Sequence, residues 1–94
     1  MGKKSRTKGA RVEREVVNIL RQAGLDAVRS APMQTFKPND EPDIRCEGKR
    51  IEVKARADGF KQIYTWIEGN DWLVIKANGK PYLVIKTLED EING

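Results

Sequence analysis

Residues 42–54 read PDIRCEGKRIEVK, and this stretch indicates both the fold and the functional site of the chain. Apolar and charged residues alternate on either side of Glu47-Gly48, a pattern typical of two strands joined by a tight turn. We therefore expect strands over residues 43–46 and 50–55.

A two-residue turn would determine which side chains face each other across these strands. Cross-strand partners then have residue numbers that sum to 95, so Ile44 faces Ile51 and Asp43 faces Glu52. Opposed side chains of this kind have Cβ atoms about 4.5–5.5 Å apart. Alternation leaves the apolar side chains for a core face and places four polar ones on the other face: Asp43, Arg45, Glu52 and Lys54. Glutamate is an unfavourable first residue for such a turn, and a three-residue loop would break the same-face arrangement.

The opposed carboxylates predict a cation site. Two facing acids ordinarily destabilise a strand pair, so removing Asp43 should slightly stabilise the metal-free protein. A divalent cation reverses the effect, because Mg²⁺ is bound through one or two carboxylates plus water and phosphate oxygens. Lys54 shares the face of Glu52, where an ammonium group can polarise a phosphate or orient the attacking water. The alternative is an ordinary charged sheet in which nearby cations neutralise the acids: Arg45, Arg50 and Lys54.

The segment before these strands predicts a helix, a strand and a loop. Apolar residues recur at helical spacing over residues 12–23, and Gly24 offers a stop. A first strand is expected over residues 25–29. Residues 32–42 are rich in proline and polar residues, which favours an exposed loop.

The carboxyl-terminal part predicts a second helix and a hairpin. The helical stripe ends at Gly69 and consists of Phe60, Ile63, Tyr64 and Ile67. Asn78-Gly79 lies between two apolar runs and suits a type I′ turn. The resulting order, α-β-β-β-α-β-β, predicts an α/β (α+β) chain with a mixed sheet and helices packed on it.

Composition and charge limit the classes of function. The chain of 94 residues has a net charge of +4, which favours a polyanionic partner, although a solvated basic tail is the alternative. Histidine is absent, which excludes histidine-dependent nucleases, His-ligated zinc fingers and Ser-His-Asp hydrolases.

The lone Cys46 and the lack of a signal peptide predict a cytoplasmic protein that is not secreted. We expect a flexible basic tail over residues 1–9 and a single domain over residues 10–94.

Glu13 provides a separate indication of a site. On a helical wheel it falls between Val17 and Leu20, at the edge of the apolar stripe. Burying an unpaired carboxylate is costly. Glu13 should therefore either pair with a nearby arginine or point toward the metal site as a third carboxylate.

The pattern P-D-x8-E-V-K over residues 42–54 resembles the motif of the PD-(D/E)xK nucleases. Its setting resembles one family in particular, the archaeal-type Holliday junction resolvases. In that family a K-G-x-x-x-E-R-E helix precedes a strand that ends in V-R-S, and an acidic strand and an E-V-K strand follow. Here KGARVERE occupies residues 8–15 and VRSA occupies residues 28–31, so the ordered match covers residues 8–54.

This resemblance implies a restriction-endonuclease-like core and a divalent-metal endonuclease that uses Mg²⁺ or Mn²⁺ and binds branched DNA as a two-fold homodimer. By position it implies four catalytic residues: Glu13, Asp43, Glu52 and Lys54. The same three acids and the main-chain carbonyl of Val53 would form the metal site. We expect DNA to contact the basic amino-terminal residues Lys3, Lys4, Arg6 and Lys8. Further contacts are expected from Arg14, Arg29, Ser30 and Arg56.

The two tryptophans predict how copies of the chain would associate. Trp66 lies off the second helical stripe, so it should be exposed, and exposed tryptophans are enriched at interfaces. Trp66 and Trp72 form the expected dimer interface, although Trp72 also suits packing within the sheet and Trp66 could stack on a base.

Two other functions stay open: a less selective nuclease acting on flap, nicked or single-stranded DNA, and a catalytically silent DNA-binding module. Acids facing a phosphate disfavour the silent module.

Overall fold

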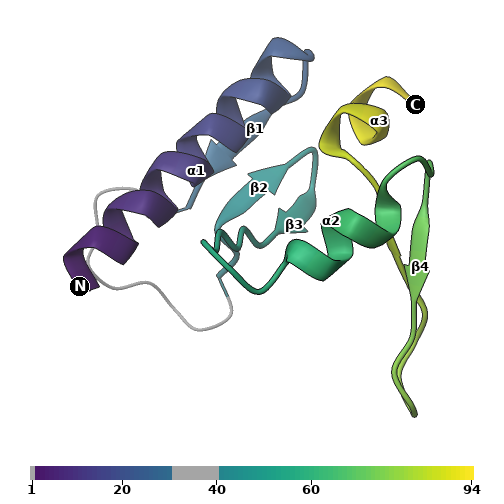
Figure 1. The fold of residues 1–94 in the computed structure, drawn as a ribbon. Helices are drawn as coiled ribbons and strands as arrows, with labels where there is room; N and C mark the ends of the chain where they lie inside the picture. Colours follow the sequence, from purple (N-terminus) through teal and green to yellow (C-terminus); the bar gives the residue numbers. More distant parts are fainter. Residues whose placement is uncertain (1, 31–40) are drawn as a thin grey trace. The chain divides into compact units, whose positions relative to one another are not determined.

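The computed structural model describes residues 2–30 and 41–94, and for residues 2–7 it describes the backbone alone. Nearly all of the loop expected over residues 32–42 lies outside the described residues. The chain divides into two compact units, Met1–Ala55 and Arg56–Gly94. Within the described residues the elements, labelled in Figure 1, are α1 (Gly2–Gln22), β1 (Ala27–Arg29), β2 (Ile44–Cys46), β3 (Lys49–Ile51), α2 (Lys61–Ile67), β4 (Leu73–Ile75), β5 (Leu83–Ile85) and α3 (Leu88–Asn93).

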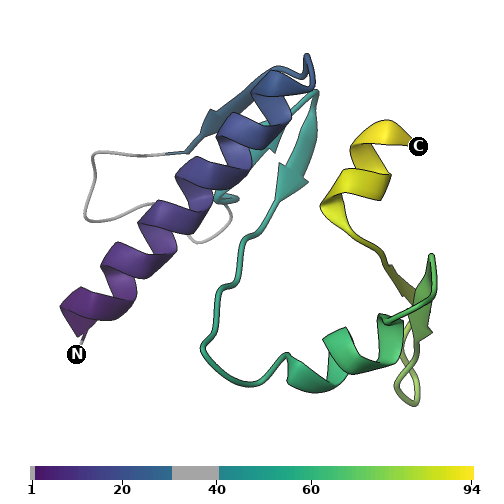
Figure 2. The same cartoon turned by 45° about the horizontal axis from the view of Figure 1, so that its top comes forward.

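The first unit consists of α1 and a three-stranded antiparallel sheet with the order β1-β2-β3. α1 packs on β1 and β2, and Figure 2 shows it alongside β1 from a second direction. The core lies between the helix and one face of the sheet and consists of Val17, Leu20, Ala27, Ile44 and Cys46. The predicted alternation is confirmed in β2, where Ile44 and Cys46 are buried and Arg45 between them is exposed.

α1 differs from the prediction at its start. It begins at Gly2, so the segment expected as a flexible tail is helical from residue 2 onward. The buried ridge is formed by Val17 and Leu20, whereas Ile19, which the periodicity placed in the core, is 44% exposed. The helix ends as predicted, because Gly24 has a φ of +89°, the left-handed conformation that glycine adopts at helix ends.

The turn between β2 and β3 has the predicted two residues. Ile44 pairs with Ile51, which confirms the register. Both turn residues have positive φ, 51° at Glu47 and 79° at Gly48, as a type I′ turn requires. Two hydrogen bonds to Asp26 compensate for the unfavourable glutamate. The Asp26 N–H donates to the Glu47 carboxylate at 2.6 Å, and the Glu47 N–H donates to the Asp26 carbonyl at 3.2 Å.

The strands of this sheet are shorter than predicted. β3 ends at Ile51 rather than at residue 55, because β2 begins at Ile44, the partner of Ile51. Glu52 and the residues that directly follow it therefore lie beyond the last paired residue of β3. β1 begins at Ala27 rather than at residue 25.

The second unit contains the antiparallel hairpin β4–β5 and the short helices α2 and α3. The predicted mixed sheet is not formed among the described residues, where all strand pairs are antiparallel and fall into two separate sheets. α3 was not predicted. The Thr87 side chain caps it by accepting from the Asp90 N–H at 3.1 Å, and acidic residues in its first turn suit the positive end of a helix.

The hairpin turn is not the predicted type I′. β4 and β5 lie within the two apolar runs that the sequence predicted as the hairpin strands, and residues 76–82 connect them. Gly79 has a φ of +73°, but among the described residues Glu47 is the one non-glycine residue with positive φ. Asn78 therefore lacks the conformation that a type I′ turn requires. The Lys80 N–H closes the turn by donating to the Ala77 carbonyl at 3.1 Å.

The aromatic side chains of this unit are largely exposed. Trp66 is 53% exposed, as predicted, whereas Tyr64, expected in the helical stripe, is 73% exposed. Trp72 is 63% exposed, which contradicts packing within the sheet but not its predicted place at an interface. A two-stranded hairpin with helices of seven and six residues is too small to enclose such large side chains. None of the helices described here combines the length and the apolar character that crossing a bilayer requires.

Candidate active site

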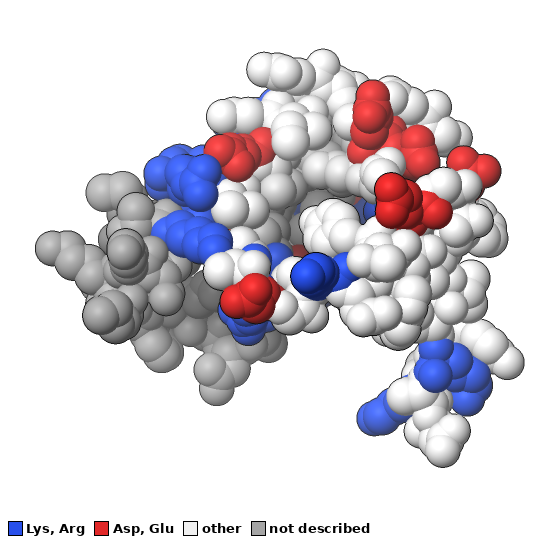
Figure 3. Space-filling model, in the orientation of Figure 1, with Lys and Arg blue, Asp and Glu red and all other residues white. Residues whose placement is uncertain are grey.

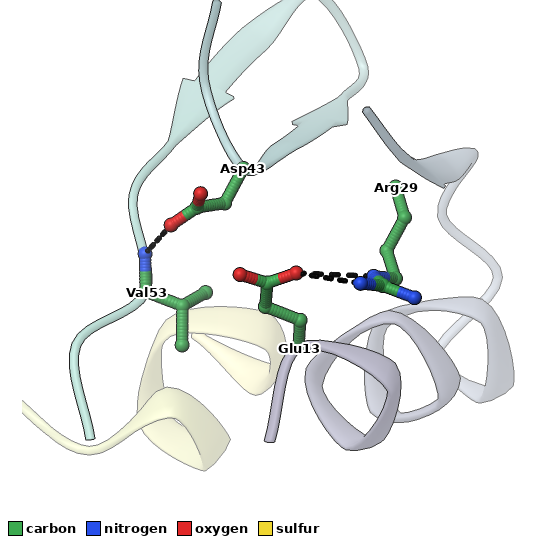
Figure 4. A network of polar contacts seen from close by, with 4 residues as sticks. All are labelled: Glu13, Arg29, Asp43 and Val53. Atoms are coloured by element: carbon green, nitrogen blue, oxygen red, sulfur yellow. Dashed lines mark hydrogen bonds and ion pairs between the residues drawn. The ribbon is translucent and has the colours of Figure 1, made fainter. Parts of the chain in front are cut away.

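Glu13 of α1 and Arg29 of β1 form a largely buried ion pair in the first unit (Figure 4). Arg29 Nη2 lies 3.0 Å from Glu13 Oε1, and the Arg29 Nε–H donates to the same oxygen at 3.1 Å. The Glu13 side chain is 20% exposed and the Arg29 side chain 18%. The structure thus bears out the pairing of Glu13 with an arginine. Glu13 reaches this position because it lies one helical turn before the buried Val17.

Asp43 directly precedes β2 and is 8% exposed. Its Oδ2 accepts from the Val53 N–H at 2.9 Å, and its main-chain carbonyl accepts from the Ser30 N–H at 2.9 Å. The carboxylate therefore bonds to the chain beyond β3. We therefore expect that removing Asp43 destabilises the metal-free protein rather than stabilising it, because the Val53 N–H would lose this acceptor.

Glu13 and Asp43 belong to the same part of the first unit although the two residues are distant in sequence. Figure 4 shows the Glu13 carboxylate between Arg29 on one side and Asp43 and Val53 on the other. Carboxylate oxygens are the ligands that hard divalent cations prefer. This part of the first unit thus offers oxygen donors from α1 and from the start of β2.

Glu52 and Lys54 lie beyond the end of β3, on a more exposed part of the same unit. Lys54 Nζ is 3.3 Å from Glu52 Oε2, and the side chains are 58% and 56% exposed, respectively. The predicted shared face of the sheet is not formed, because Glu52 and Lys54 lie beyond β3 and Asp43, expected opposite Glu52, is buried. A pair this exposed contributes little to stability.

The predicted cluster of three acids is not assembled among the described residues, where no three acidic or cysteine side chains could together hold a metal ion. Glu13 bonds to Arg29, Asp43 accepts from the Val53 N–H, and the Glu52 carboxylate pairs with Lys54.

Glu41 and Arg45 form a contact that the sequence analysis missed. Arg45 donates to both carboxylate oxygens of Glu41, at 3.3 and 3.4 Å. The Arg45 guanidinium holds the pKa of Glu41 below its usual value, and a hydrogen bond to the Ser30 side chain adds to this effect. Nothing in the sequence indicated this contact, because residues four apart are neighbours on a helix but not on a strand.

The candidate DNA-binding residues of the first unit lie on α1 and at the end of β1. Arg14 is exposed on α1, and Figure 3 shows basic side chains gathered beside the amino-terminal half of this helix. Lys8 is partly buried. The side chains of three further candidates, Lys3, Lys4 and Arg6, lie outside the described residues.

The remaining candidates divide between the two units. Arg29 bonds to Glu13, and the Ser30 N–H donates to the main-chain carbonyl of Asp43. Both therefore belong to the acidic site, which consists of Glu13, Asp43 and the residues bonded to them. Arg56 is exposed and belongs to the second unit, as do the exposed Trp66 and Trp72.

Comparison with known proteins gives one family match. A sequence model of the family described as archaeal Holliday junction resolvase (hjc) matches residues 4–93, which include the whole acidic site. Comparisons with curated proteins and with solved structures found no match.

Proposed function

The chain belongs to the archaeal Holliday junction resolvase family, and on that premise we propose that the acidic site of its first unit cleaves branched DNA. The family consists of structure-selective, metal-dependent DNA endonucleases of the PD-(D/E)xK type. The residue assignment rests on two largely buried carboxylates in the same part of the first unit, those of Glu13 and Asp43 (Figure 4). Two carboxylates that share a buried space repel each other, and a bound cation would reverse this repulsion.

The donor set of this site suits Mg²⁺ or Mn²⁺. Both cations prefer carboxylate, carbonyl and water oxygens, and Mg²⁺ needs only one or two carboxylates. The chain has no histidine, and its one cysteine is buried in the core. We assign four residues as the ones that would hold the cation: Glu13, Asp43, Glu52 and Val53 through its carbonyl. When bound, such a cation compensates the charge of the phosphate and activates a water molecule.

We assign Arg29 the role of positioning Glu13. Two N–H groups of Arg29 donate to the same oxygen, Oε1, which fixes the orientation of the carboxylate. Figure 4 shows the other oxygen of Glu13 directed toward the side of Asp43 and Val53. Partners of this kind commonly orient the residues that bind a metal.

Lys54 is the residue that we expect to contact the phosphate at the cleaved bond. Its side chain is 58% exposed, and its Nζ lies 3.3 Å from Glu52 Oε2. A phosphate can therefore approach it without displacing a buried contact. An ammonium placed there stabilises the negative charge that develops during hydrolysis.

Basic residues of each unit, taken separately, are the proposed contacts to DNA. We propose contacts from Lys8, Arg14, Ser30 and Arg56, and from the amino-terminal residues Lys3, Lys4 and Arg6. Basic side chains gather beside the amino-terminal half of α1, which supports the contacts of the first unit (Figure 3). Neutralised phosphates would release counterions and make binding dependent on salt.

Two copies of the chain would act together on one junction. A four-way junction has approximate two-fold symmetry, and resolving it requires two symmetric nicks. One chain carries one acidic site, so a C2 homodimer is the simplest arrangement that makes both nicks. Trp66 and Trp72, both more than half exposed, are the proposed interface residues.

Cleavage of labelled four-way junctions tests the assignment of the acids. Asp43→Asn and Glu52→Gln should abolish cleavage and preserve DNA binding, because each change removes charge and retains shape. Glu15→Gln is the matched control, since Glu15 is exposed on α1 and pairs with Arg11 at 3.6 Å. Rates equal to wild type in either active-site variant would contradict the assignment.

A further inference from the structure

We propose that the tip of the β4–β5 hairpin, residues 76–82, is a second DNA-binding site that stacks an exposed base on Tyr82. The inference rests on the proposed function in one respect, because it takes DNA as the partner. It concerns the second unit alone and uses none of the residues of the acidic site.

The hairpin carries positive charge without acidic neighbours in the sequence. Residues 72–88 contain three lysines and no aspartate or glutamate. Lys86 pairs with Glu91 at 2.8 Å, which leaves Lys76 and Lys80 as the cations of the tip. Figure 3 shows basic side chains at the hairpin tip and acidic ones toward the end of the unit that carries α3.

Tyr82 adds an aromatic surface beside these lysines. Its side chain is 72% exposed. Lys76 Nζ lies 5.5 Å from the centre of the ring and also donates to the Ala77 carbonyl at 3.2 Å. Lys76 thus covers part of the ring in a cation–π contact and leaves most of it open to solvent.

This combination matches the chemistry of DNA that exposes a base. Aromatic rings beside basic groups bind nucleic acid by stacking on a base while the cations contact the phosphates. In a linear duplex both faces of an internal base pair are covered by neighbouring pairs. Base pairs at a branch point can lack one neighbour, so a junction offers a base face to Tyr82 that a duplex does not.

Charge favours DNA over a second copy of the chain as the occupant. Two tips related by a two-fold axis would bring four lysines together, and their repulsion would oppose association. The negatively charged phosphates next to an exposed base complement Lys76 and Lys80.

Fluorescence anisotropy in EDTA tests the proposal on the full chain, because binding is then measured without cleavage. The probes are a four-way junction, a single-stranded oligonucleotide and a linear duplex of matched length. Tyr82→Ala should weaken binding to the first two by at least about fivefold and binding to the duplex by less than about twofold. Tyr82→Phe should bind like wild type. Lys80→Ala should lower the salt slope on single-stranded DNA by up to about 0.7.

Tyr64→Ala is the matched control, since Tyr64 belongs to the same unit and is 73% exposed. It should leave the affinity for every probe unchanged. Equal losses on all three probes, or no loss with Tyr82→Ala, would overturn the proposal. A lower molar mass of Tyr82→Ala in light scattering would also overturn it, because the tip would then be a protein interface. A wild type that binds junctions but does not cut them in Mg²⁺ would contradict the proposed function and leave this binding test intact.

Discussion

At the scale of single residues, the Glu13–Arg29 pair is the contact whose loss should cost most. Arg29→Ala would leave the Glu13 carboxylate largely buried and without its donors, and we expect a loss of about 1–3 kcal/mol in the free energy of unfolding. The double variant with Glu13→Gln should recover part of that loss, since the buried charge is gone. Urea unfolding measures both. An unchanged urea midpoint for Arg29→Ala would contradict the pairing.

Asp43 should stabilise the metal-free protein, in contrast to what two opposed carboxylates predict. Asp43→Ala removes the acceptor of the Val53 N–H and should cost about 1–3 kcal/mol, whereas Asp43→Asn retains an acceptor oxygen and should cost less. Thermal unfolding in EDTA distinguishes the two accounts. A higher melting temperature for Asp43→Ala would support repulsion as the dominant effect.

The arginine partner of Glu13 was one of two outcomes predicted from the sequence, but the partner of Asp43 could not be predicted. Glu13 lies on the edge of the helical stripe and Asp43 next to a strand, and both positions follow from periodicity. The partner of Asp43 is a main-chain N–H, which every residue except proline carries, so no pattern of side chains indicates it. Burial of Asp43 follows from that bond.

At the scale of elements, the extent of α1 can be tested with glycine substitutions. Gly9→Ala should raise the free energy of unfolding by about 0.5–1 kcal/mol if the helix continues through this position. Gly48→Ala should lower it by about 1–2 kcal/mol, because the φ of +79° is unfavourable for alanine. Neither added methyl group meets an atom within 4 Å, so backbone conformation alone decides both signs. No gain with Gly9→Ala would favour the flexible tail.

Local patterns predicted the elements unequally well. The register of β2 and β3 followed from a two-residue turn and alternation, because a shift by one residue would expose Ile44. The hairpin turn failed, because Asn78-Gly79 is compatible with more than one turn geometry. α3 was missed although Thr87 and the acids after it form a recognisable cap.

At the scale of the whole molecule, the basic amino-terminal segment should govern the salt dependence of DNA binding. Replacing its four cations with glutamine preserves the helical backbone and should reduce the log–log slope by up to about 0.9 per cation on duplex DNA; these cations are Lys3, Lys4, Arg6 and Lys8. Anisotropy titrations at several salt concentrations measure the slope. An unchanged slope would mean that the segment does not contact phosphates.

Assembly is the second property of the whole molecule that can be tested. We expect light scattering to give the mass of a dimer for the wild type and of a monomer for Trp66→Glu, because the exposed tryptophan is the proposed contact. Thr65→Glu adds the same charge at the neighbouring exposed position and should remain dimeric. A wild-type monomer at micromolar concentration that still cuts junctions symmetrically would refute the dimer.

We propose that Glu13 and Asp43 together hold the cation that cleavage requires. The most direct test is the Mg²⁺ concentration that gives half-maximal cleavage of a four-way junction. We predict that Glu13→Gln and Asp43→Asn raise this concentration at least about tenfold or abolish cleavage, while Glu15→Gln leaves it unchanged. Half-maximal cleavage at the wild-type Mg²⁺ concentration in both active-site variants would contradict the claim.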